Sequence, residues 1–247
     1  MAKKLLSLLR EIEWKLVAKI ALVVLFLLFF WIEGSSWWSI IFFVISFSFL
    51  YFSESRERQS FIASFWLLAL LSALGISAAL QNNASFYVPF LIVLLFTAFL
   101  SILLGLLRFF FQDRVVVYGV VNTVLLFGFF LYFFTFSLSW TLLLFIALGI
   151  FFLLREFFLF AGILWRGRVF LGSIVISFLA LELAILVRFL PLGFINATAS
   201  LCLFLVLMRD TAKAHFEGTF NLSFALRSSI ILLFGTALIF AASPWGI

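Results

Sequence analysis

VFLGSIVISFLALELAILVRFL, residues 169–190, is long and apolar enough to cross a bilayer as one helix, which takes about 20 such residues. On an ideal helix, small residues form one narrow stripe where a second helix can approach closely: Ser173, Ser177, Ala180 and Ala184. Glu182 points roughly the opposite way, and an ionised carboxylate inside a bilayer is costly unless it is paired or hydrated. We therefore expect this helix to be held from two sides, near the centre of a bundle. The alternative is a neutral, hydrogen-bonded Glu182 with a structural role.

The composition is that of an integral membrane protein built from helices. Hydrophobic residues make up 67% of the chain and charged residues 11%, against about a quarter charged in soluble domains. The apolar runs are continuous and not alternating, which favours helices over a β-barrel. Basic residues lie in short segments between these runs, as topology signals do, so the net charge of +6 does not indicate nucleic-acid binding. We expect a multi-pass protein of the cell membrane, plasma or inner, with no nucleic-acid partner.

Hydropathy divides the chain into an N-terminal amphipathic segment and about nine membrane spans. Residues 1–15 place apolar side chains at helical spacing opposite charged ones, which predicts a helix lying in the membrane interface. Residues 16–247 form a predicted single transmembrane helical domain. Its expected spans are 16–32, 37–52, 60–80, 86–107, 115–136, 139–164, 169–190, 193–208 and 227–243. The predicted fold is thus an all-α, polytopic transmembrane bundle.

The distribution of basic residues predicts the orientation of these spans. If the N-terminus is cytoplasmic, every lysine and arginine except Arg188 falls in or beside a cytoplasmic segment. This asymmetry follows the positive-inside rule. A missed or invented span would move all later charges to the other side, so the regularity supports the whole count. We therefore expect a cytoplasmic N-terminus and a C-terminus outside.

The predicted span 139–164 is interrupted by two adjacent charges, Arg155 and Glu156. It is either one long tilted helix, or a helix that stops before them and continues along the cytoplasmic interface. An antiparallel hairpin with the next span, turning near Gly167, would bring Arg155 within reach of Glu182. We therefore predict a buried ion pair in which Arg155 holds Glu182 ionised. The competing arrangement is a proton shared between Glu156 and Glu182.

The longest predicted cytoplasmic connection, residues 209–226, holds three groups with ligand chemistry: Asp210, His215 and Glu217. Together they could bind a divalent metal or a phosphorylated lipid head group, but their spacing matches no metal signature and we expect no metal. The alternative is a solvated loop, part of which lies on the membrane as a helix because phenylalanines recur in it at helical spacing. The candidate binding residues of the whole chain are therefore Glu182, Arg155, Asp210, His215 and Glu217.

Catalytic signatures are absent from the sequence. It contains no Gly-rich phosphate loop, no HExxH helix, no nucleophile elbow and no paired acids, so we expect no cofactor and favour a protein that is not an enzyme. The preferred hypothesis is a subunit or scaffold of a membrane assembly, with the lipid bilayer and other membrane proteins as its partners. The first alternative is a transporter or channel for a small or lipophilic substrate using Glu182, although the prolines lie at span ends and not in mid-span. The second is a lipid-modifying enzyme at the cytoplasmic interface.

Overall fold

The computed structural model describes residues 114–135, 140–163 and 165–243, together with single residues before them. These single residues are 21, 24, 25, 28, 32, 45, 64, 66–68, 70, 71, 91, 94, 95 and 98, and all of them are helical. The described part of the chain consists of helices and turns and contains no strand. The predicted interfacial helix over 1–15 lies outside the described residues, as do most of the first four predicted spans.

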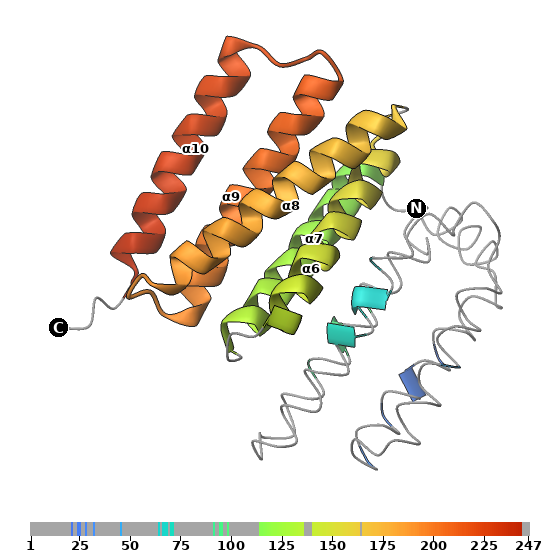
Figure 1. The fold of residues 1–247 in the computed structure, drawn as a ribbon. Helices are drawn as coiled ribbons and strands as arrows, with labels where there is room; N and C mark the ends of the chain where they lie inside the picture. Colours follow the sequence, from blue (N-terminus) through green and yellow to red (C-terminus); the bar gives the residue numbers. More distant parts are fainter. Residues whose placement is uncertain are drawn as a thin grey trace, which may run out of the picture. The chain divides into compact units, whose positions relative to one another are not determined.

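Five long helices follow one another in the second half of the chain (Figure 1). They are α6 (Arg114–Thr135), α7 (Trp140–Phe160), α8 (Arg166–Arg188), α9 (Phe194–Phe216) and α10 (Leu222–Ala241). All five are long and apolar enough to cross a membrane. The helical membrane class predicted from the composition is therefore confirmed for this part of the chain. The total count of spans and the orientation of the termini stay predictions.

The chain forms two compact units, Met1–Val121 and Asn122–Ile247, and the boundary between them falls inside α6. Within the first unit, the hydroxyl groups of Ser64 and Tyr118 are both buried and lie 2.7 Å apart, at hydrogen-bond distance. The rest of α6 and the four following helices belong to the second unit. The single transmembrane domain expected over 16–247 stays a prediction.

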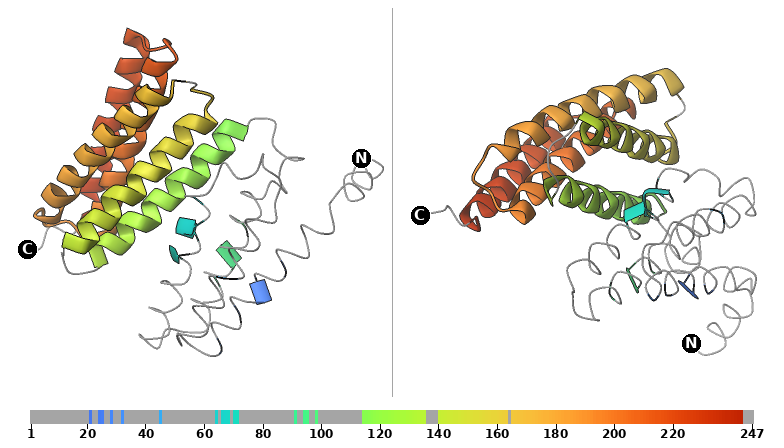
Figure 2. Two further views of the ribbon diagram at one scale, coloured as in Figure 1. Left: turned by 45° about the vertical axis from the view of Figure 1, so that its right-hand side comes forward. Right: turned by 60° about the horizontal axis from the view of Figure 1, so that its bottom comes forward.

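In the second unit α7, α8, α9 and α10 pack as consecutive antiparallel neighbours, with α10 at the edge beside α9 (Figure 1 and Figure 2). Gly149 of α7 lets the ring of Phe129 come close, because a Cβ atom at Gly149 would lie 2.4 Å from Cζ of that ring. The largest fully buried side chains are mostly aromatic: Phe129, Phe130, Phe133, Phe158, Leu126 and Ile146. Side chains of α6 and α7 therefore fill much of the interior of this unit.

α7 runs without a break through the Arg155–Glu156 pair, so the single-helix alternative is the correct one, although the helix ends at Phe160. Gly162 ends it, because its φ of +85° is a left-handed conformation that glycine adopts without a steric cost. Gly162 and the residue after it donate the two backbone hydrogen bonds of a Schellman cap. The hairpin therefore turns before Gly167, which already belongs to α8.

The prediction of a long connection over 209–226 was wrong, because most of this segment is helical. α9 continues to Phe216 and α10 begins at Leu222, so only the turn 217–221 joins them. Gly218 starts the turn with a φ of +70°. The side chain of Asn221 caps α10 by accepting a hydrogen bond of 2.8 Å from the backbone N–H three residues on. Capping residues end these helices, whereas the charged residues that ended the predicted span lie within α9.

Candidate functional site

Arg209 is a buried charge in α9, with 5% of its surface exposed. Its Nη1 donates hydrogen bonds to Oδ1 of Asn122 at 3.0 Å and to Oγ1 of Thr123 at 3.3 Å, and both acceptors belong to α6. Its Nε donates to Oδ1 of the neighbouring Asp210 at 3.0 Å. A buried guanidinium group is tolerated when its donors are paired in this way. We call these four residues, with Phe157 of α7, the Arg209 cluster.

Residues of α7 complete the surroundings of Arg209. The guanidinium carbon lies 4.1 Å from the ring centroid of Phe157, which is a cation–π distance. Nδ2 of Asn122 donates a hydrogen bond of 3.1 Å to the carbonyl oxygen of Leu153, while its Oδ1 accepts from the arginine. Glu156, beside Phe157 in the chain, is also buried. The cluster therefore ties α6, α7 and α9 together inside the second unit.

This cluster was not predicted from the sequence, in which Arg209 was interpreted as a topology signal at the end of a span. Asn122 was the residue that could have indicated a buried polar contact, because an amide within an apolar helix needs hydrogen-bond partners. Its partner could not be predicted, because α6 and α9 are not consecutive and their register depends on how the helices between them pack.

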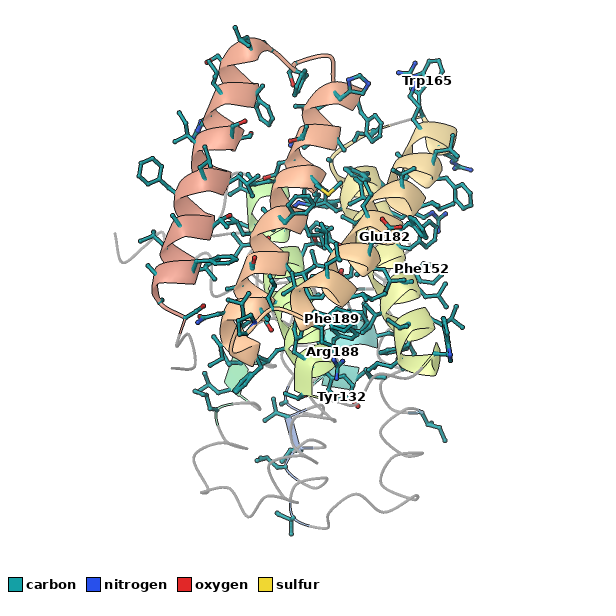
Figure 3. All side chains as sticks on the ribbon, turned by 60° about the vertical axis from the view of Figure 1, so that its left-hand side comes forward. Tyr132, Phe152, Trp165, Glu182, Arg188 and Phe189 are labelled. Atoms are coloured by element: carbon teal, nitrogen blue, oxygen red, sulfur yellow. The ribbon has the colours of Figure 1, made fainter. Side chains whose placement is uncertain are left out.

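Glu182 lies on the exposed side of α8 (Figure 3). The predicted stripe is confirmed as a packing face, because its four members are all buried: Ser173, Ser177, Ala180 and Ala184. The residues one or two turns away on the side of Glu182 are exposed and apolar: Val175, Phe178, Leu179 and Leu186. Within the described part of the chain, α8 is therefore held on its stripe side, and the described residues form no second contact around Glu182, so that contact stays a prediction.

Arg155 is exposed on α7, as Glu182 is on α8, so the predicted buried ion pair was wrong. The ion pairs formed among the described residues do not include one between these two side chains. The position of the turn is the reason, because α7 ends and α8 begins before Gly167, which changes the register between the two helices. Glu156 is the buried acid of α7, so the shared proton with the exposed Glu182 is not formed either.

Asp210, His215 and Glu217 have separate surroundings. Asp210 pairs with Arg209, and Oε1 of Glu217 lies 3.8 Å from Nζ of Lys213, one helical turn before it. His215 is exposed. In the part of the chain that the structure describes, no three histidine, cysteine or carboxylate side chains form a group that could hold a metal ion.

His215 lines a groove with a volume of about 520 Å³ between α8, α9 and α10, which we call the His215 groove. Its walls are mostly apolar and include a few hydroxyl groups: Ile176, Phe204, Leu232, Thr211, Ser228 and Ser229. The groove does not extend to Glu182, and the described residues that line it include no arginine. It is therefore a mostly apolar cleft with one histidine among its lining residues.

Comparisons of the chain with protein families, with curated proteins and with solved structures found no match. The class of the protein thus follows from its own helices. Five apolar helices of membrane-spanning length define a helical integral membrane protein.

Proposed function

We propose that this chain is a non-enzymatic subunit of a membrane assembly, and that a membrane helix of a partner protein packs on the face of α8 that carries Glu182. The observation behind this proposal is the exposure of Glu182 among exposed apolar neighbours. A face of this kind meets either lipid or another protein in a membrane, and only a protein supplies a fixed polar partner for the acid.

The depth of Glu182 makes contact with lipid unfavourable. It lies six residues before Arg188, the last residue of α8, which is about 9 Å along the helix axis. Side chains on a helix lean toward its N-terminus, so the carboxyl group of Glu182 leans away from this nearer end and deeper into the bilayer. An ionised acid near the centre of a membrane helix costs about 2.5–3.5 kcal/mol in insertion measurements. A hydrogen-bond donor on a partner helix would offset part of this cost.

Neither alternative function has a comparable observation in its favour. A transport path through Glu182 would need a polar cavity at that residue, and the His215 groove does not extend to it. A lipid-modifying enzyme would need reactive groups gathered near His215, whereas Asp210 and Glu217 are each paired with a basic neighbour. We therefore retain the subunit hypothesis.

Site-specific photo-crosslinking in native membranes tests the proposal. A photoreactive phenylalanine analogue replaces Phe178, one turn from Glu182 and 58% exposed, and a matched control replaces Phe234 of α10, which is 69% exposed. We expect a discrete protein adduct at position 178 and only lipid adducts at position 234. Equal protein adducts at both positions, or lipid alone at both, would refute a specific docking face.

A second variant tests the role of the acid itself. Glu182→Leu in the protein that carries the probe at position 178 should lower the yield of the adduct about tenfold, which corresponds to 1.4 kcal/mol of association energy. Glu217→Gln removes an acid from the turn after α9 and serves as the matched control, for which we expect no change. An unchanged adduct in Glu182→Leu would show that this carboxyl group does not hold the partner.

A further inference from the structure

The polar groups of the His215 groove all lie in its half nearer the turn between α9 and α10, which we call its polar end although Phe216 and Phe220 also line it. Thr211 and His215 lie one turn apart on α9, near its end at Phe216, and Ser228 and Ser229 line the groove from α10. One to two turns further from that end, the walls are apolar side chains of all three helices: Ile176, Phe204 and Leu232. A cleft with this division matches a molecule that has one polar head and one hydrocarbon tail.

The polar groups of the groove are available to a ligand. In the part of the chain that the structure describes, the side chains of Thr211, His215, Ser228 and Ser229 make no hydrogen bond. Ser177 of α8 and Thr198 of α9, by contrast, donate to the backbone of their own helix, to Ile174 O at 2.9 Å and to Phe194 O at 2.7 Å. Hydroxyl and imidazole groups without a hydrogen-bond partner between membrane helices favour a ligand that has acceptor oxygens.

The groove is open because α10 packs loosely against the neighbouring helices. Of the twenty residues of α10, all of them described, none is buried. Near the far end of the pair, α9 and α10 are held together by a hydrogen bond of 3.0 Å between Asn196 and Ser243, and Gly235 lets Leu203 approach closely. These contacts close the pair on the side away from His215, and the space between the helices remains at the His215 end.

Basic residues lie at the end of the bundle where α9 ends and α10 begins, although the described residues that line the groove include none of them. Arg227 is exposed on another face of α10, beside Leu226 and Ile230, and Lys213 pairs with Glu217 at 3.8 Å. α8 begins at the same end of the bundle with Arg166 and Arg168, because Phe216, the last residue of α9, packs against Gly172 of α8. Basic side chains beside a cleft between membrane helices attract anionic lipid head groups.

We propose that the His215 groove binds one anionic glycerophospholipid of the surrounding membrane. One acyl chain lies along Phe204 and Leu232, and the phosphate and ester oxygens accept hydrogen bonds from Thr211, His215 and Ser228. The volume of about 520 Å³ is within the range of about 300–1,000 Å³ that small-molecule sites occupy. This site is separate from the face of Glu182, so either proposal can fail without the other.

Photolabelling of the full chain in vesicles tests the lipid site. The vesicles contain phosphatidylcholine and a minor fraction of phosphatidylglycerol with a photoreactive group in one acyl chain. We expect the label to concentrate on peptides of α9 and α10 that line the groove, and unlabelled phosphatidylglycerol to compete better than phosphatidylcholine. Labelling spread evenly over the exposed faces of all helices, or equal competition by the two lipids, would overturn the proposal.

A matched pair of variants separates the groove from the general surface of α10. Ala225→Phe fills the groove and should lower the labelling about tenfold, as expected for a loss of 1.4 kcal/mol. Ala237→Phe makes the same change on an exposed part of α10 outside the groove and should leave labelling unchanged. Equal labelling of the two variants would contradict binding in the groove.

Small changes at the polar end test recognition of the head group without filling the groove. Thr211→Val with Ser228→Ala removes two hydroxyl donors and keeps the shape of the side chains. This protein should lose the preference for phosphatidylglycerol over phosphatidylcholine, while an acyl-labelled phosphatidylcholine continues to label the groove. A preference that survives in the double variant would rule out the assigned donors.

Discussion

Replacing Arg209 by methionine tests whether the Arg209 cluster stabilises the packing of α6, α7 and α9. Methionine is apolar and flexible, and it leaves Oδ1 of the fully buried Asn122 without its arginine donor. A buried acceptor left without a partner costs about 1–3 kcal/mol, and the lost contact with Phe157 adds about 0.5–2 kcal/mol. The side chain of Asp210 is 45% exposed, so water replaces the arginine there at little cost. We expect Arg209→Met to lower the free energy of unfolding by about 2–4 kcal/mol.

The partner variant, Asn122→Leu, disrupts the cluster from α6. It removes an acceptor from a buried arginine and also the donor to the carbonyl oxygen of Leu153. Breaking a buried charged contact on one side costs about 3–5 kcal/mol, whereas replacing both partners by apolar residues costs much less. The double variant, Asn122→Leu with Arg209→Met, should therefore be more stable than the sum of the single effects predicts, by about 1–3 kcal/mol.

Reversible unfolding in mixed micelles of a mild detergent and dodecyl sulfate measures these free energies. Asp210→Asn is the control, because it alters the exposed contact of Arg209 and should cost less than about 1 kcal/mol. Single effects of Asn122→Leu and Arg209→Met that add to within about 0.5 kcal/mol would refute the coupling between the two side chains.

Two further predictions concern packing and orientation. Gly149→Ala places a methyl group 2.4 Å from Cζ of the buried Phe129 and should cost about 1–3 kcal/mol in the same unfolding assay. Gly167→Ala, with no atom within 4 Å of the new methyl group, should be neutral or stabilising, and equal losses in both variants would contradict the packing. For the orientation, a cysteine at Gly193 should react with an impermeant maleimide added to intact cells, and one at Thr219 only after permeabilisation. The opposite pattern would reverse the predicted topology.

The helices of the second unit could largely be predicted from local sequence. A membrane helix satisfies its own backbone hydrogen bonds, so a long apolar run is sufficient to specify it. The predicted span 115–136 corresponds to α6 at Arg114–Thr135, and the predicted span 169–190 to α8 at Arg166–Arg188. The helical period also predicted which side of α8 is buried, because small residues on one stripe have no other common role.

Helix ends were predicted less well, because a charged residue does not by itself end a membrane helix. Arg209 stands inside α9, and the helix continues past it because its guanidinium group finds acceptors within the bundle. α7 and α9 end at Phe160 and Phe216, and each end is followed two residues later by a glycine with a positive φ angle, Gly162 and Gly218. Glycine is typical of this position after a helix, but Gly149 and Gly235 lie inside helices, so glycine alone does not specify the ends.

The partners of the charged residues depended on tertiary structure. Periodicity placed Glu182 opposite the stripe of α8, but it contained no information on whether anything packs there. Arg209 and Asn122 meet although 87 positions separate them in the chain. Such a contact depends on the order, tilt and register of several helices, and each of these follows from side-chain packing over the whole unit. The local pattern of one helix determines only which of its faces is available for that packing.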